Sequence, residues 1–148
     1  EKILNLKEFF LKHFGIEEPR FALCGFNPHS GEDGILGQEE IEILNPAVEK
    51  LVRLGVNITK PLPADTLFVG AGKAFYNQEC CPYDCYIANY HDQGLIPIKT
   101  VAGDRTVNMT IGLDIIRTSP GHGTAFDIAG KDIASDAGMI AAIRAVIN

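Results

Sequence analysis

Apolar residues recur with helical spacing in three parts of the chain. Residues 1–14 place Ile3, Phe10 and their apolar neighbours near a 3.6-residue period, and Gly15 provides a C-terminal stop. Residues 38–54 are predicted to be helical, with Pro46 restarting the helix as a first-turn proline. Residues 133–147 predict a closing amphipathic helix.

Short apolar runs between these helices predict strands. The first covers residues 20–25, and further strands are predicted at 56–59, 85–90, 107–111 and 115–119. The glycine-rich segments 26–37 and 121–130 read as loops, and P-L-P-A-D-T reads as a turn. The alternation of strands and helices predicts an α/β fold with a largely parallel sheet and flanking helices.

Composition narrows the classes of partner. The chain has 148 residues, 46% of them hydrophobic and 22% charged, with a formal net charge of −6. No basic run exists to neutralise nucleic-acid phosphates, so no nucleic-acid partner is expected. Apolar stretches are shorter than a membrane span, so no membrane partner is expected either. Because the sequence begins with Glu1 rather than Met, we expect either a fragment of a longer protein or a processed product.

Cys80, Cys81 and Cys85 form the spacing C-C-x-x-x-C, which raises the question of structural zinc. The fourth cysteine, Cys24, is distant and lies in an apolar run, and no histidine has zinc-finger spacing from the cluster. We therefore favour free thiols, as in a reducing cytoplasm.

Two histidines follow predicted strands. His29 lies in N-P-H-S-G-E-D-G and His91 in Y-H-D-Q-G. Ligands of open α/β sheets bind beyond the carboxyl ends of the strands, so the two loops can converge on one cation. Asp65 and Asp92 are candidates to orient the imidazoles. The alternative is that each histidine only makes local hydrogen bonds; two ligands are also too few for a catalytic zinc site, which usually has three.

Lys99, Asn108 and Arg117 recur in a region of mostly apolar and small residues. Lysine and arginine bind phosphate and carboxylate by charge and forked hydrogen bonds, and an amide adds a neutral donor. Together these residues are candidates to hold a small phosphorylated substrate. The alternative is that the two charged residues are solvated strand-edge residues.

The segment S-P-G-H-G-T-A-F-D-I-A-G-K is a candidate nucleotide-binding loop. Gly121 and Gly123 allow close approach of a ligand, His122 offers a ring to an adenine, and Asp127 offers an acceptor to ribose hydroxyls. Thr124 belongs to the same candidate site. The chain lacks the G-x-G-x-x-G fingerprint, and the alternative is a tight turn with a helix-start aspartate.

Five segments resemble one family. H-G-T-A-F-D-I-A-G-K-D-I-A is similar to the adenosine-binding loop of the isocitrate and isopropylmalate dehydrogenases. The segments N-P-H-S-G-E-D-G, P-L-P-A-D-T, Y-H-D-Q-G-L-I-P-I-K, V-N-M-T-I-G-L and I-I-R-T-S-P-G-H-G-T-A resemble the 4-hydroxythreonine-4-phosphate dehydrogenases (PdxA) of vitamin B6 biosynthesis. They occur in the family's order and cover essentially the whole chain.

The resemblance implies an isopropylmalate-dehydrogenase-like fold and a homodimer with shared active sites. Residues 1–95 would belong to the metal and substrate lobe, and residues 96–148 would return to the NAD-binding lobe. His29 and His91 match two of the family's three metal-binding histidines; the third, and a His-Thr substrate contact, belong to a segment before Glu1. Lys99, Asn108 and Arg117 match substrate contacts.

The implied activity is oxidation of 4-phosphooxy-L-threonine at C3 by NAD (or NADP), assisted by zinc, magnesium or cobalt, and then decarboxylation to 3-amino-2-oxopropyl phosphate. Lys99 is a candidate general base, because burial beside a cation lowers the pKa of a lysine. Two alternatives remain open. One is a paralogue acting on threonate or erythronate phosphate or on a cyclic dihydrodiol, and the other is an inactive fragment that binds a nucleotide or a partner.

Overall fold

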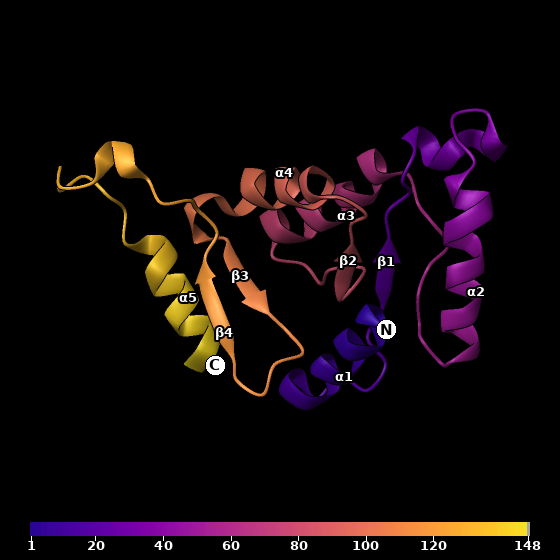
Figure 1. The fold of residues 1–148 in the computed structure, drawn as a ribbon, viewed down its shortest axis with the longest axis horizontal. Helices are drawn as coiled ribbons and strands as arrows, with labels where there is room; N and C mark the ends of the chain where they lie inside the picture. The colour runs from indigo at the N-terminus through magenta and orange to yellow at the C-terminus, as the bar shows by residue number, and fades with distance from the viewer. Residues whose placement is uncertain (148) are drawn as a thin grey trace. The chain divides into compact units, whose positions relative to one another are not determined.

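The computed structural model of this chain describes residues 1–147, and the chain divides into two compact units. The first unit spans Glu1–Pro97 and the second spans Ile98–Asn148. The boundary falls inside helix α4 (His91–Ala102). Figure 1 shows the order of the helices and strands along the chain.

The sheet of the first unit is centred on strand β1 (Phe21–Leu23), which pairs in parallel with β2 (Cys85–Ile87). At the other edge of β1, the predicted strand 56–59 is reduced to a single parallel bridge between Phe21 and Ile58. The Thr59 hydroxyl there accepts a hydrogen bond from the Leu23 amide at 3.1 Å, which replaces a backbone ladder bond. The parallel arrangement predicted from the sequence is therefore present in this unit.

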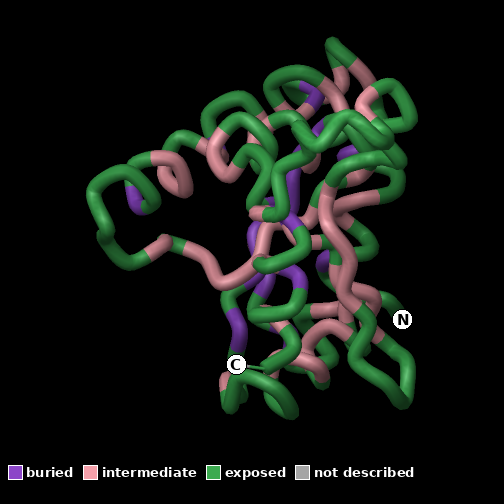
Figure 2. The backbone as a smooth tube through the Cα atoms, turned by 90° about the vertical axis from the view of Figure 1, so that its left-hand side faces the viewer, coloured by how far each residue is buried: buried purple, intermediate pink, exposed green. Residues whose placement is uncertain are grey.

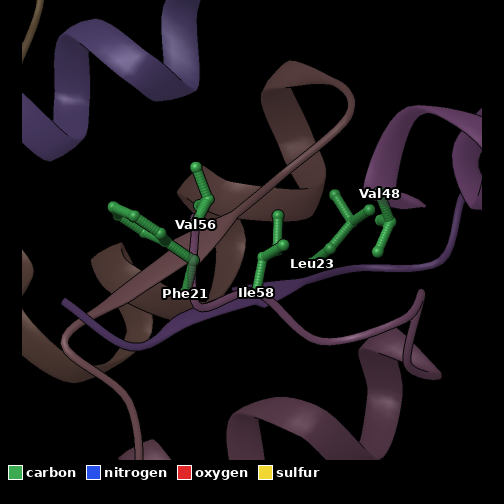
Figure 3. Close-up of a cluster of buried hydrophobic side chains, with 5 residues drawn as sticks. All are labelled: Phe21, Leu23, Val48, Val56 and Ile58. Atoms are coloured by element: carbon green, nitrogen blue, oxygen red, sulfur yellow. The ribbon is translucent and has the colours of Figure 1, made fainter. Parts of the chain in front are cut away.

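Both faces of β1 are buried, because its side chains alternate between two clusters. Phe21 and Leu23 pack with Val48, Val56 and Ile58 on one face (Figure 3). Helices α1 (Lys2–Phe14) and α2 (Asn45–Arg53) contribute to this cluster. The opposite cluster is built from Ala22, Cys24 and Leu67. Helix α3 (Ala64–Asn77) provides Leu67, so β1 is covered by helices on both sides.

Helices are present in all three regions where the periodic apolar pattern predicted them, but the last begins at Ala137 rather than at residue 133. Gly15 ends α1 in the left-handed conformation, at a φ of 66°. The predicted helix 38–54 consists of a π-helical turn (Glu40–Leu44) followed by α2, and Pro46 lies in the first turn of α2 as expected.

Two helices were not predicted. Helix α3 begins inside the segment expected to be a turn, and α4 begins at His91, where only a strand end was expected. Each contains residues that disfavour a helix, Gly70 in α3 and Pro97 in α4. At Gly70 a side chain would approach the Pro82 ring to 3.1 Å, so packing explains the glycine.

The second unit contains a hairpin and one long helix. Strand β3 (Val107–Thr110) pairs antiparallel with β4 (Arg117–Pro120), so the expectation of a largely parallel sheet is wrong here. The connection between these strands is short, and a short connection favours antiparallel neighbours. Helix α5 (Ala137–Ile147) packs on the hairpin, where the Thr118 hydroxyl donates to the Ala142 carbonyl at 2.9 Å. Short 3₁₀ turns at Gly103–Arg105 and Phe126–Ile128 complete the unit.

Fully buried positions are few, as the burial colouring of Figure 2 shows. Several large apolar side chains are exposed, among them Ile35 at 81% and Phe126 at 83%. None of the helices described for residues 1–147 is long and apolar enough to cross a membrane.

Candidate functional site

The His29 loop has an uncommon backbone. His29, Ser30, Glu32 and Asp33 all have positive φ, between 42° and 54°, so the segment Pro28–Gly34 makes a left-handed turn. This conformation is costly for residues other than glycine, so other contacts must hold it in place. A side chain at Gly31 (φ 84°) would lie 2.8 Å from the Gly37 carbonyl oxygen, so only glycine fits there.

Glu40 supplies much of that support. Its Oε1 atom accepts hydrogen bonds from the amides of Phe26 at 2.7 Å and Asn27 at 2.8 Å. Its Oε2 atom accepts from the Asn27 side chain at 2.8 Å. Glu40 is 4% exposed, and such burial by itself raises the pKa of a carboxyl group. The hydrogen bonds outweigh burial, and the pKa of Glu40 lies below its ordinary value.

His29 is exposed and pairs with a carboxylate. Its Nδ1 atom lies 2.6 Å from Oε1 of Glu32. The hydrogen bond to Glu32 and the charge of Glu32 raise the pKa of His29, and the charge of Asp65 adds to the increase. Asp65 lies in the first turn of α3, so the structure places this predicted residue within electrostatic range of His29.

His91 is the first residue of α4 and follows the carboxyl end of β2 after three intervening residues. Its Nδ1 atom lies 2.8 Å from Oδ1 of Asp92, which was predicted to orient it. The two histidine loops also meet in the first unit, because the rings of Phe26 and Tyr90 make an edge-to-face contact at 6.2 Å. Phe26 precedes His29 by three residues, and Tyr90 directly precedes His91.

The chemistry of these residues suits a cation. In each pair the carboxylate engages Nδ1, so Nε2 is the ring nitrogen that a metal would bind. Carboxylate-paired imidazoles are typical metal ligands. Among residues 1–147, however, no three His, Cys, Asp or Glu side chains are placed together to hold a metal. Among the described residues, His29 and His91 are therefore candidate ligands only, and no third ligand is placed beside them.

Two amide side chains that were not predicted from the sequence, those of Asn89 and Gln93, connect the starts of these loops. The Gln93 side chain donates to the Gly25 carbonyl at 2.6 Å and accepts from the Asn89 amide at 2.8 Å. The Asn89 side chain donates to the Cys24 carbonyl at 2.7 Å. The presence of Gln93 inside the H-D-Q-G segment was the available signal, because a glutamine is mostly exposed unless it has partners.

The hairpin of the second unit brings two predicted substrate contacts together. Asn108 pairs with Ser119 and Arg117 with Thr110 in the antiparallel register, which puts all four on one face. Asn108 and Arg117 are exposed, and the Arg117 Nη1 atom donates to the Thr110 hydroxyl at 3.0 Å. An anion on this face could therefore bind both the Asn108 amide and the Arg117 guanidinium, whose orientation the Thr110 hydroxyl restricts.

Lys99 lies in the last turn of α4 and is exposed. The described residues do not provide the burial that was expected to prepare it as a general base. It lies on a helix, so the alternative of a strand-edge residue is wrong for Lys99.

The candidate nucleotide loop is exposed at His122, Gly123, Thr124 and Asp127. His122 Nδ1 donates to the Gly123 carbonyl at 2.8 Å. This leaves Nε2 as the ring nitrogen that a nucleotide would contact. Gly121 has a packing role, because a side chain there would lie 2.8 Å from Thr106. Asp127 lies inside the 3₁₀ turn Phe126–Ile128, whose N-cap is Ala125, so it is not the capping residue of that turn.

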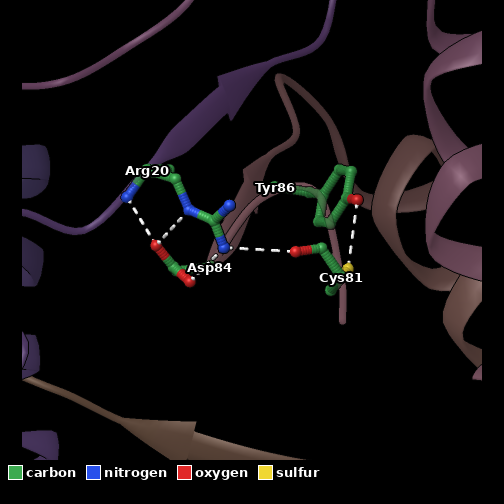
Figure 4. Close-up of polar contacts among 4 residues, drawn as sticks. All are labelled: Arg20, Cys81, Asp84 and Tyr86. Carbon is green, nitrogen blue, oxygen red and sulfur yellow. Dashed lines mark hydrogen bonds and ion pairs between the residues drawn. The ribbon is translucent and has the colours of Figure 1, made fainter. Parts of the chain in front are cut away.

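The cysteines are free thiols, as favoured from the sequence. Cys24 is buried and Cys80 is exposed, and burial raises the pKa values of Cys24 and Cys85 to about 11. Cys81 contacts the Tyr86 hydroxyl at 3.3 Å, and its carbonyl accepts from Arg20 at 3.1 Å (Figure 4). These contacts belong to the packing around β2.

The fold and the loops define a class: an α/β protein whose polar loops extend from the carboxyl ends of parallel strands, where such sheets bind small ligands. Residues 1–146 match the family described as "Pyridoxal phosphate biosynthetic protein PdxA". The chain belongs to this family.

Curated relatives in the family carry one name. A 4-hydroxythreonine-4-phosphate dehydrogenase of Bradyrhizobium diazoefficiens is 55% identical over 131 residues, covering 88% of this chain and 36% of the relative. The corresponding protein of Caulobacter vibrioides is 53% identical over 133 residues, covering 90% of this chain and 38% of the relative. The chain therefore spans less than two fifths of the length of these relatives.

Solved structures agree with this assignment. A 4-hydroxythreonine-4-phosphate dehydrogenase of Klebsiella pneumoniae matches 97% of this chain with a TM-score of 0.79 and 42% identity, and 41% of that structure is covered. A terephthalate 1,2-cis-dihydrodiol dehydrogenase of Burkholderia xenovorans matches 92% of this chain with a TM-score of 0.65 and 38% identity, and 41% of it is covered.

Proposed function

We propose that the full-length protein carrying this chain is an NAD-dependent, metal-assisted dehydrogenase of 4-phosphooxy-L-threonine in vitamin B6 biosynthesis. The observation that carries the proposal is the family match over residues 1–146. The names of the curated relatives support the substrate. The exposed pair of Asn108 and Arg117 on one face of the hairpin supports a phosphorylated substrate.

In this proposal Arg117 and Asn108 bind the phosphate or a neighbouring anionic oxygen. A guanidinium offers forked hydrogen bonds, and its contact with the Thr110 hydroxyl limits the orientations that Arg117 adopts. Lys99 adds a further positive charge. Their contribution is to position C3 of the substrate for reaction.

His29 and His91 would hold the divalent cation through Nε2, while Glu32 and Asp92 orient the rings. When bound, the cation supplies Lewis acidity that favours the alkoxide at C3. Zinc, magnesium and cobalt are the candidates. The third ligand would come from the part of the enzyme outside this chain, in a homodimer with shared active sites.

The nucleotide would contact the loop residues His122, Gly123, Thr124 and Asp127. Gly121 would fix the start of this loop, because its backbone packs closely against Thr106. NAD, or NADP, supplies the hydride acceptor. The C3–H bond breaks with its electron pair leaving as hydride, and the hydroxyl proton is lost to a general base. In the resulting 3-oxo acid the C1–C2 bond breaks, releasing carbon dioxide and leaving 3-amino-2-oxopropyl phosphate after C2 gains a proton.

A related activity is the second candidate. The structural match to a dihydrodiol dehydrogenase shows that the fold also occurs in a protein named for a substrate without phosphate. The anion-binding face at Asn108 and Arg117 favours a phosphate substrate, and threonate or erythronate phosphate would fit the same contacts. An inactive nucleotide-binding or partner-binding role is the non-enzymatic alternative.

The test is a substrate comparison with the purified full-length protein. NADH formation is followed with 4-phosphooxy-L-threonine, threonate phosphate, erythronate phosphate and a cyclic dihydrodiol. The proposal expects the highest kcat/KM with 4-phosphooxy-L-threonine and one carbon dioxide per NADH. Turnover of threonate phosphate alone would show that it, and not 4-phosphooxy-L-threonine, is the substrate. No turnover of any of the four compounds would favour the inactive alternative. We also propose a cytoplasmic location, as the free cysteines favour, and cell fractionation would test it.

A further inference from the structure

The carboxyl ends of β1 and β2 are joined by side-chain hydrogen bonds that extend beyond the strand ladder. Backbone pairing of the two strands ends with Leu23 and Ile87, followed by a hydrogen bond from the Cys24 amide to the Ile87 carbonyl at 2.9 Å. Beyond that point Asn89 and Gln93 bind the next two carbonyls of the first strand, those of Cys24 and Gly25. The side chains therefore extend the connection after the ladder has stopped.

Gln93 is at the centre of this connection and is 8% exposed. The two polar atoms of its side chain contact different segments. Nε2 donates to the Gly25 carbonyl, and Oε1 accepts from the backbone N–H of Asn89. An amide side chain provides both the donor and the acceptor that this arrangement uses, without a change of charge. A buried carbonyl or amide that loses its partner is costly, so both partners of Gln93 depend on it.

The position of this bridge in the sequence connects it with the two histidines. Gly25 precedes His29 by four residues, and Asn89 precedes His91 by two. Gln93 itself follows His91 by two residues, inside the first turns of α4. Each histidine loop thus begins at the bridge, and the start of α4 that carries His91 is directly attached to the strand that leads to His29.

The start of the His29 loop is also fixed by a second residue. Glu40 holds the amides of Phe26 and Asn27, the two residues that follow Gly25. Only Pro28 separates the anchored Asn27 from His29, and the contact of His29 with Glu32 lies within the same left-handed turn. Any change in the Gln93 bridge is therefore expected to move the two histidines relative to each other, because the loop itself is held.

We propose that Gln93, assisted by Asn89, is a positioning residue that sets the separation of the His29 and His91 imidazoles and thereby the affinity for a divalent cation. The inference rests on the proposed function, in which both histidines bind the cation. Gln93 need not touch the cation, since its effect passes through the backbone at Gly25 and Asn89.

The experiment uses the full-length protein and Co²⁺, whose absorption reports the ligand environment. Gln93→Leu removes both hydrogen bonds at similar volume. Thr59→Val is the matched control, because it removes the hydrogen bond to the Leu23 amide at the opposite edge of β1. Both variants are expected to lower resistance to urea, but only Gln93→Leu is expected to weaken Co²⁺ binding, by about tenfold or more, and to change the absorption spectrum.

Two milder variants keep the test decisive if Gln93→Leu does not fold. Gln93→Glu keeps an acceptor for the backbone amide of Asn89 but loses the donor to Gly25, and Asn89→Ala loses the side-chain donor to Cys24. Both are expected to weaken Co²⁺ binding more than Thr59→Val does. Wild-type affinity in the Gln93 and Asn89 variants would overturn the inference, and so would an equal loss in Thr59→Val, which would show a role in stability alone. Failure of the wild-type protein to bind Co²⁺ would instead overturn the metal site of the proposed function.

Discussion

Arg20 and Asp84 form a two-pronged ion pair directly before the paired strands β1 and β2. Arg20 Nη2 lies 2.9 Å from Asp84 Oδ1, and Nε lies 3.0 Å from Oδ2 (Figure 4). The Arg20 amide also donates to Oδ2 at 2.7 Å. Because Phe21 is paired with Cys85, this contact fixes the register at the amino ends of the strands, and the Gln93 bridge fixes it at the carboxyl ends.

The Asp84 contact predicts a dependence of stability on pH. The hydrogen bonds from Arg20 lower the pKa of Asp84 below its ordinary value of 3.8. A carboxyl group with a lowered folded-state pKa stabilises the fold above its unfolded-state pKa, and this contribution is lost as the pH falls through the folded-state value. Asp84→Asn is therefore expected to lower the urea midpoint at pH 7 and to lose less stability than the wild type below pH 3.8. Parallel pH profiles of the two proteins would contradict this.

Glu40 is predicted to be the main anchor of the His29 loop. Glu40→Gln places an amide NH₂ against one of its present donors, so we expect a loss of about 2 kcal/mol in the free energy of unfolding. Amide hydrogen exchange at Phe26 and Asn27 should accelerate. Glu42→Gln, an exposed neighbour with the same change in charge, is the control and should alter neither measurement.

The cysteines are predicted to react in a definite order. Cys80 is exposed, whereas burial raises the pKa values of Cys24 and Cys85 to about 11 and keeps them as thiols at pH 8. A thiol reagent at pH 8 should modify Cys80 first and leave Cys24 and Cys85 unmodified until the protein unfolds. Peptide mapping by mass spectrometry checks this, and early labelling of Cys24 would show that the core around β1 opens.

Arg117 is predicted to bind the anionic part of the substrate. A hydrogen bond to a charged group contributes about 1.5–3 kcal/mol, so Arg117→Gln should raise KM for 4-phosphooxy-L-threonine by roughly 10- to 100-fold. Arg144→Gln removes an exposed arginine from α5 with the same change in charge and should leave KM unchanged. An equal effect of both substitutions would indicate a general electrostatic effect rather than a contact.

The sequence predicted most of the elements that have a clear period. The helix at residues 1–14 and the strand at 20–25 were found because their apolar residues and flanking glycines or prolines agree. Helices α3 and α4 were missed because Gly70 and Pro97 oppose a helix locally, and only tertiary packing favours it. The antiparallel hairpin was missed because apolar runs do not report the direction in which strands pair.

The candidate site was predicted in part. The carboxylate partner of His91 was found because Asp92 is adjacent in the sequence, whereas the partner of His29 is Glu32 rather than a distant aspartate. Glu40 and Gln93 were not predicted, because a buried charge or amide is recognised only when its partners on other segments are known. The metal, nucleotide and substrate roles themselves remain predictions.

The most direct test of the account is the cation dependence of NADH formation by the full-length protein. The wild type, His29→Ala and His91→Ala are freed of metal with a chelator and then titrated with zinc, cobalt or magnesium in the presence of 4-phosphooxy-L-threonine and NAD. We predict that activity returns with metal in the wild type, and that each variant needs at least about tenfold more metal or stays inactive. Full activity without metal, or identical titrations of all three proteins, would contradict the assignment of His29 and His91 as ligands.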